Sequence, residues 1–160
     1  MIYHKKTKKQ KQNKTKRGGK KLNKTIKTRS IKKSLVSFEK EILVKFLEML
    51  NAVKLFHWKT YSFAIHEATD KLYESLNKNI DRFVEIYLGK NNTRINEWEN
   101  TLHAIQYSRS KDFKSKMLEY REMLTDLNLC FDEKKDSDLL TVRDDILSDL
   151  NQFFYLLSFK

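Results

Sequence analysis

The sequence has few of the residues on which most non-helical folds depend. Its 160 residues contain no proline and only three glycines, Gly18, Gly19 and Gly89. Tight turns in β-sandwiches and barrels need these residue types, and no short Val- and Ile-rich runs alternate with helical segments, so all-β and α/β folds are disfavoured. The single cysteine, Cys130, rules out a disulfide framework and a cysteine-based zinc site, and we expect it to be a small buried hydrophobe. A mainly helical protein remains.

Long hydrophobic segments are also missing. Charged residues make up 34% of the chain, and nowhere do about 18 apolar residues run together, so we expect no transmembrane helix. The N-terminus is polar and basic, and it lacks the apolar region of a secretory signal peptide. We therefore expect a soluble intracellular protein, located in the cytoplasm, in the nucleus or, if its source is viral, in the virion.

Acidic residues are absent from the first part of the chain. Residues 1–33 contain fifteen Lys and Arg and no Asp or Glu, whereas the remaining 18 Lys and Arg face all 21 Asp and Glu. Residues 34–160 therefore carry a net charge of −3. This charge distribution predicts a disordered basic tail over 1–33, followed by one mildly acidic domain over 34–160.

The charge of the tail favours a polyanionic partner. We expect DNA or RNA first and an anionic membrane second, and because the tail offers no apolar helical face for a membrane anchor, the prediction is DNA and no membrane. Nuclear import and simple solubilisation are alternatives, because short Lys-rich runs serve both purposes. The candidate DNA-binding residues are Lys5, Lys6, Lys8, Lys9, Lys11, Lys14, Lys16, Arg17, Lys20 and Lys21.

Apolar residues in the rest of the chain recur at intervals of three and four, which is the pattern of one helical face. They predict four helices, over residues 36–60, 65–88, 112–129 and 137–159. Four amphipathic helices of this length, with a long connection in the middle, predict an all-α fold, a ferritin-like four-helix bundle.

The middle connection has a weaker helical pattern of its own. Trp98, Leu102 and Ile105 are spaced as on a helix, so we expect a short crossover helix over 93–107, between the second and third long helices. Gly89 precedes this segment and is expected to end the second helix, since glycine readily adopts the left-handed conformation found at helix ends.

The second predicted helix carries potential metal ligands in one narrow sector. Spacings of four, eleven and four residues place them at about 0°, 40°, 60° and 100° around the helix. They are His66, Asp70, Asp81 and Glu85, with His57 at the end of the preceding helix. Imidazole and carboxylate ligands suit iron, with Mn or Zn as alternatives. Because Asp and Glu on helices are also ordinary solvated charges, spacing alone leaves both interpretations open.

Distance restricts how such a site could form. Asp70 and Asp81 lie about 16 Å apart along a helix, so one chain cannot bring both acidic positions to one metal. A shared site needs a second, antiparallel copy, in which the Asp81–Glu85 pair of one subunit meets the histidines and Asp70 of the other. No Glu-x-x-His occurs in the sequence, which argues against the usual intrachain di-iron bundle. We therefore expect a homo-oligomer built from two-fold pairs.

Parts of the sequence resemble a known family. Residues 55–74, LFHWKTYSFAIHEATDKLYE, and residues 80–85, IDRFVE, resemble the signature of the Dps miniferritins, the DNA-binding proteins from starved cells. A weaker resemblance reaches the last predicted helix, so that it covers about 36–159. The form of the signature found here, Lys54-Leu-Phe-His-Trp-Lys-Thr-Tyr-Ser together with Leu88-Gly-Lys, is similar to that of uncharacterised Dps-like proteins of large DNA viruses.

The resemblance implies a function. Dps proteins form hollow shells of twelve subunits and oxidise Fe(II), preferentially with hydrogen peroxide. The iron ligands of these proteins lie between two-fold-related subunits, and they match His57, His66, Asp70, Asp81 and Glu85 of this chain. The family's tryptophan beside the first ligand matches Trp58. The interval from His57 to His66 is shorter than in that family and lacks its usual glycine. We expect an iron-oxidising, iron-storing dodecamer that protects DNA; the alternative is a structural nucleic-acid-condensing or virion core protein that keeps the fold without the oxidase.

Overall fold

The computed structural model describes residues 38, 40–95, 101–104, 107 and 109–159. The chain divides into two units, Met1–Glu39 and Lys40–Lys160. The Lys-rich tail, with all its candidate DNA-binding residues, lies outside the described residues, as do Trp98 and Ile105 of the expected crossover helix. Within the described ranges all regular secondary structure is helical and no strand occurs, which confirms the all-α prediction.

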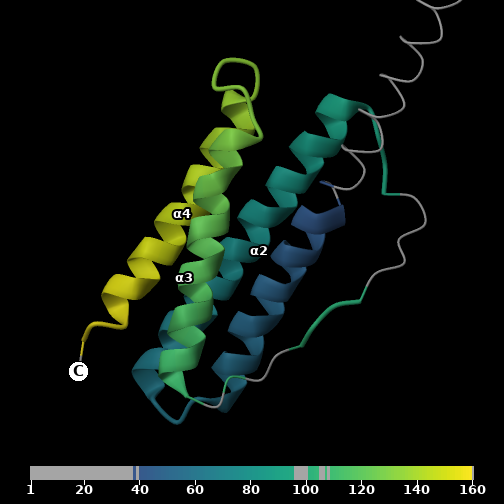
Figure 1. Ribbon diagram of the computed structural model, residues 1–160. Coiled ribbons are helices and arrows are strands. Elements are labelled where there is room, and N and C mark those ends of the chain that lie inside the picture. Colours follow the sequence, from purple (N-terminus) through teal and green to yellow (C-terminus); the bar gives the residue numbers. More distant parts are fainter. Residues whose placement is uncertain (1–37, 39, 96–100, 105–106, 108, 160) are drawn as a thin grey trace, which may run out of the picture. The chain divides into compact units, whose positions relative to one another are not determined.

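The described part of the chain contains four long helices (Figure 1). The first covers residues 40–59. It is followed by α2 (Phe63–Asn91), α3 (Ser110–Asp126) with the short 3₁₀ turn η1 (Leu127–Leu129), and α4 (Ser137–Leu156). These elements confirm the four predicted helices, with ends displaced by a few residues. None of the described helices is long and apolar enough to cross a membrane.

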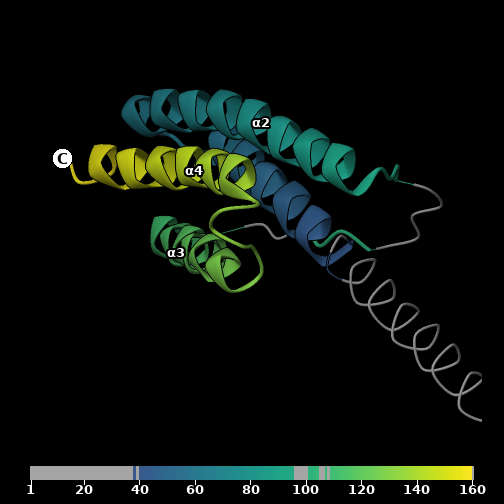
Figure 2. The same cartoon turned by 90° about the horizontal axis from the view of Figure 1, so that it is seen from above.

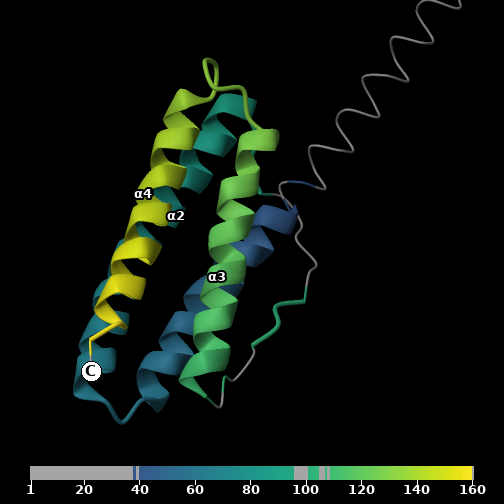
Figure 3. The ribbon, with the colours of Figure 1, turned by 60° about the vertical axis from the view of Figure 1, so that its left-hand side comes forward.

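The described helices run in two opposite directions. The first helix and α2 run antiparallel as a hairpin, and so do α3 and α4, whereas α2 and α3 point the same way (Figures 1 and 3). Seen from above, α4 lies between α2 and α3, and it packs against both (Figure 2). The described residues thus form an all-helical, bundle-like arrangement.

Aromatic rings link all four helices in the core. Phe46 and Phe83 pack edge to face with centroids 5.3 Å apart, and Phe56 stacks on Phe113 at 4.0 Å. Phe153 of α4 meets Phe113 at 6.0 Å. All five rings are buried, and burial of such a side chain contributes about 1.5–3 kcal/mol. The apolar positions that predicted the helices thus form the core and fix how the helices pack.

The second helix ends later than predicted. Gly89 lies inside α2, and the helix ends at Asn92, which adopts the left-handed conformation with a φ of 49°. The backbone N–H of Asn92 donates to the Gly89 carbonyl at 3.1 Å. Asparagine tolerates this conformation better than other residues with a side chain, so it can replace glycine here. The prediction that Gly89 ends the helix was therefore wrong.

The described residues of the expected crossover helix are not helical, so that prediction is wrong for this part of the connection. The first helix binds the backbone of this segment instead. The His103 N–H donates to Glu48 Oε1 at 3.4 Å, and Lys59 Nζ donates to the Tyr107 carbonyl at 3.1 Å. A short helix is usually stabilised by burying its apolar face. Leu102 belongs to the apolar pattern of this segment but is exposed, so that source of stability is missing here.

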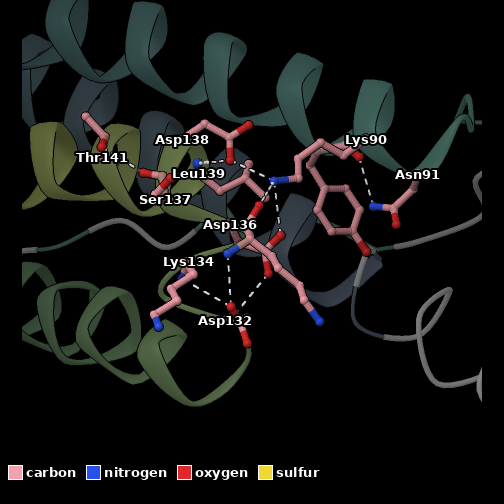
Figure 4. A network of polar contacts seen from close by, with 11 residues as sticks. Lys90, Asn91, Asp132, Lys134, Asp136, Ser137, Asp138, Leu139 and Thr141 are labelled. Carbon is pink, nitrogen blue, oxygen red and sulfur yellow. Dashed lines mark hydrogen bonds and ion pairs between the residues drawn. The ribbon is translucent and has the colours of Figure 1, made fainter.

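One lysine ties the end of α2 to the turn between α3 and α4 (Figure 4). Lys90 Nζ lies 3.1 Å from Asp136 Oδ1 and 2.7 Å from Asp138 Oδ1, and it also donates to the Lys135 carbonyl. The hydrogen bond with Asp138 raises the pKa of Lys90 and lowers the pKa of Asp138.

Cys130 lies in the same turn, directly after η1, and is exposed, so the expectation of a buried cysteine was wrong.

Candidate metal site at the helical hairpin

A short turn joins the first helix to α2 and sets the geometry of the candidate site. Ser62 caps α2, because its hydroxyl oxygen accepts from the Ile65 N–H at 3.4 Å. Residues 60–62 are all described, and none of them has a positive φ, so this turn needs no glycine. The turn therefore brings His57 and His66 together in spite of the short interval between them.

The two imidazole rings form what we call the histidine clasp, His57 and His66. Their centroids are 3.9 Å apart, and their planes are inclined by 26°. His57 Nδ1 lies 3.1 Å from the His66 carbonyl oxygen, and His66 Nδ1 lies 3.3 Å from the His57 carbonyl oxygen. A carbonyl oxygen can only accept, so each Nδ1 carries the proton and donates it. In each neutral ring the proton-free nitrogen is Nε2, which is then available to bind a metal.

Asp70 places a carboxylate beside the histidine clasp. Its Oδ1 lies 3.7 Å from His57 Nε2 and 3.6 Å from Lys54 Nζ. When the His57 ring is neutral, the lone pair of Nε2 faces Asp70 Oδ1, and a cation between these two atoms stabilises such an arrangement. In the single chain Lys54 supplies positive charge to Asp70, while its ammonium lies 4.7 Å from the Tyr73 ring centroid and 6.0 Å from the Trp58 ring centroid.

The other two candidate ligands do not join this group. Asp81 and Glu85 lie further along α2, and both are exposed. Among the described residues, no three His, Cys, Asp or Glu side chains are arranged to hold a metal ion. A single chain therefore brings His57, His66 and Asp70 together and leaves the two remaining acids apart. Its described part holds no complete metal site.

Sequence analysis missed two residues that contact this group, Lys54 and Thr69. Thr69 is fully buried, and its Oγ1 lies 3.2 Å from His57 Nδ1. Lys54 precedes His57 by three residues, and Thr69 follows His66 by three, so each shares a helical face with a histidine. A polar residue on the otherwise apolar face of α2 was the available signal for Thr69.

The sequence model of one protein family matches residues 57–157, which is more than half of the chain. The chain belongs to the DUF5856 family. This family is one of unknown function. The DUF5856 match begins at His57 and contains all five candidate ligands together with Trp58 and Thr69, whereas the Lys-rich tail lies before it. No curated protein and no solved structure matches the chain.

Proposed function

We propose that this protein oxidises Fe(II) at sites shared between two copies of the chain, stores the ferric product in a Dps-like shell, and binds DNA through its basic tail. Fe(II) is the substrate in this proposal, bound by the histidine clasp and Asp70 of one subunit together with Asp81 and Glu85 of another. The observation that carries the proposal is the clasp, in which both Nδ1 atoms donate to backbone carbonyls, so that Nε2 is the nitrogen each ring can offer to a metal, and His57 Nε2 lies 3.7 Å from Asp70 Oδ1.

The donor atoms fit iron. Imidazole nitrogen and carboxylate oxygen are ligands that suit Fe(II), and they also suit Mn and Zn. Both imidazoles donate from Nδ1 to a backbone carbonyl, which is the outer contact that orients a metal-binding histidine. His57 is only 6% exposed, so packing holds its ring, whereas the Asp70 side chain is 48% exposed and open to an incoming cation.

The spacing on α2 supports a site shared by two subunits. Asp70 follows His66 by four positions, and Glu85 follows Asp81 by four positions. A two-fold axis at the level of residues 75–76 therefore brings His66 opposite Glu85 of an antiparallel copy, and Asp70 opposite Asp81. Each copy then supplies the acids that the other lacks, and one pair of subunits contains two equivalent sites.

The same side of α2 carries apolar surface that a second copy can cover. The ligands His66, Asp70, Asp81 and Glu85 form one stripe along α2, which we call the ligand stripe. Three apolar residues lie in the same sector of the helix and are only half-buried in the single chain: Tyr73, Val84 and Leu88. Covering apolar surface stabilises association by about 25 cal/mol per Å², before the entropic cost of association is subtracted. The surface needed for pairing and the ligands needed for the site therefore lie on one stripe.

The proposed reaction moves electrons from iron to peroxide. Two Fe(II) ions each give up one electron to one hydrogen peroxide, which takes up two protons and leaves as two waters. The part of the protein is to hold the ions near each other and near the oxidant. The carboxylates of Asp70, Asp81 and Glu85 favour the ferric product, since its higher charge interacts more strongly with them.

The basic tail accounts for the second half of the proposal. Residues 1–33 carry fifteen Lys and Arg without an acid, whereas residues 34–160 have a net charge of −3. Lys and Arg contacts to phosphate do not read base sequence, so the tail is expected to bind DNA of any sequence. The candidate ligands and the tail lie in different parts of the chain, so iron oxidation and DNA binding should be separable.

Stopped-flow measurement of Fe(II) oxidation with hydrogen peroxide tests the proposal. We expect the wild-type protein to oxidise Fe(II) faster than buffer, and His66→Ala and Asp81→Ala each to abolish the fast phase, because each variant removes a ligand from every shared site. Asp126→Ala removes another exposed carboxylate, from α3, and is the matched control, with an unchanged rate. Wild-type protein that oxidises iron no faster than buffer would contradict the oxidase and favour the nucleic-acid-condensing alternative.

A further inference from the structure

Thr69 is a buried polar residue to which the proposed reaction gives no role. It is 0% exposed, and its Oγ1 lies 2.7 Å from the Ile65 carbonyl oxygen, 2.9 Å from the His66 carbonyl oxygen and 3.2 Å from His57 Nδ1. A hydroxyl in an apolar interior costs free energy unless its hydrogen bonds are made. The three contacts therefore determine where the hydroxyl donates its proton and where its oxygen accepts one.

The direction of these hydrogen bonds follows from the donor inventory. A threonine hydroxyl has one proton, and the carbonyl oxygens of Ile65 and His66 can only accept. The two shortest contacts of Thr69 therefore use its proton, which leaves an oxygen lone pair toward His57. His57 Nδ1 then faces two acceptors, Thr69 Oγ1 and the His66 carbonyl oxygen, and must carry the proton itself.

The competing tautomer has a ready partner. If His57 carried its proton on Nε2, a small movement of Asp70 would bring its Oδ1, now 3.7 Å away, within hydrogen-bond distance of that proton. A ring held in this way would occupy the carboxylate and would have no lone pair to offer at Nε2. The balance between the two tautomers therefore decides whether His57 and Asp70 bind each other or a cation.

We propose that Thr69 is a positioning residue that fixes His57 in the Nδ1–H tautomer and so presents Nε2 to the metal. This inference rests on the proposed function, since it concerns the same site. With Thr69 Oγ1 and the His66 carbonyl both accepting from Nδ1, the His57 ring is restrained more tightly than by one acceptor alone. Outer contacts of this kind typically change metal affinity by about 10–100-fold when they are removed.

The test compares Thr69→Val, which keeps the shape and loses the hydroxyl, with Thr69→Ser, which keeps the hydroxyl. The full-length protein labelled with ¹⁵N only at histidine has four labelled residues, so solid-state NMR at a pH of about 8.5 can report the tautomer of His57 in an assembly of any size. The spectrum of a His57→Asn variant assigns the signals. Co²⁺, titrated by its visible absorption, is the metal probe.

In Thr69→Val we expect a new population of His57 protonated at Nε2 and a Co²⁺ affinity lower by about tenfold, because the His66 carbonyl still accepts from Nδ1. Thr69→Ser should keep the wild-type tautomer and affinity. Thr125→Val is the matched control, since Thr125 on α3 also donates to the carbonyl four residues earlier, at 3.0 Å, far along the sequence from the site. It should change neither reading.

Two results would overturn the inference. One is a Thr69→Val spectrum in which His57 stays fully protonated at Nδ1; the other is an equal tautomer shift in Thr69→Ser and Thr69→Val. Circular dichroism shows whether Thr69→Val is folded, and if it is not, Thr69→Ala replaces it in the same comparison. Wild-type protein that binds no Co²⁺ while Thr69→Val still shifts the tautomer would contradict the proposed function and leave the positioning role intact.

Discussion

A shared site makes a quantitative prediction for mixed assemblies of two inactive variants. His66→Ala removes a ligand from the histidine side of the site and keeps the Asp81–Glu85 pair, whereas Asp81→Ala does the reverse. Alone, each variant damages every site of the assembly, because both copies of a pair carry the same change. Co-expression of the two variants produces pairs that contain one chain of each kind.

The expected recovery follows from two-fold symmetry. At equal expression about half of the pairs are mixed, and in each mixed pair one of the two sites combines the intact halves of both chains, while the other combines both damaged halves. About a quarter of all sites are then intact, so we expect about a quarter of the wild-type rate of Fe(II) oxidation per chain. The rate is measured by stopped flow with hydrogen peroxide on the purified mixed assembly.

A second mixture is the control. His66→Ala and His57→Ala damage the same side of the site, so no pairing of these chains restores an intact site, and the mixture should stay inactive. Recovery in both mixtures, or in neither while wild-type protein is active, would refute the argument that the histidine clasp and the Asp81–Glu85 pair come from different chains.

Two further predictions concern stability and DNA binding. The buried Arg143 donates to the Leu124 carbonyl at 2.9 Å and to Asn128 Oδ1 at 2.7 Å, so Arg143→Met should lower the free energy of unfolding, measured in urea, by about 2–4 kcal/mol. Arg82 forms an exposed ion pair, so Arg82→Met should lower it by less than about 1 kcal/mol. Equal losses in the two variants would contradict the account of the α3–α4 packing. Deletion of residues 1–33 should abolish binding to duplex DNA in gel-shift titrations and leave iron oxidation unchanged. For the full chain, the logarithm of the binding constant should fall linearly with the logarithm of the salt concentration, with a slope of about −0.9 per phosphate contacted. A truncated protein that binds DNA as tightly as the full chain would place the DNA surface on the bundle.

The fold was predictable from sequence wherever a helix buries a continuous apolar face. Positions such as Phe46, Phe83 and Phe113 recur at helical intervals, and burial against neighbouring helices is what stabilises helices of this length. Predictions failed where individual hydrogen bonds decide the structure. Asn92 ends α2 in place of Gly89, because its left-handed backbone is stabilised by hydrogen bonds that periodicity does not report. Glu48 binds the backbone of the connection, a long-range contact invisible to a local pattern.

The candidate site was predictable in part for the same reason. The helical spacing of His66 and Asp70 puts both on one face of α2, and the short turn brings His57 to them. The tautomers of the clasp depend on which backbone carbonyls lie near each Nδ1, and this requires the packing of two helices. Thr69 contributes through a hydroxyl whose role is set by its acceptors. Spacing cannot identify such a residue, because a threonine on an apolar face is compatible with simple packing.

The mass of the assembly is the most direct test of the central claim, which is that two chains together form each iron site. We predict that light scattering of the full-length protein, in salt high enough to release nucleic acid, gives an even multiple of the 19.3 kDa chain, with a dodecamer expected from the resemblance to Dps proteins. A stable monomer of 19.3 kDa at micromolar concentration would contradict both the shell and the shared site.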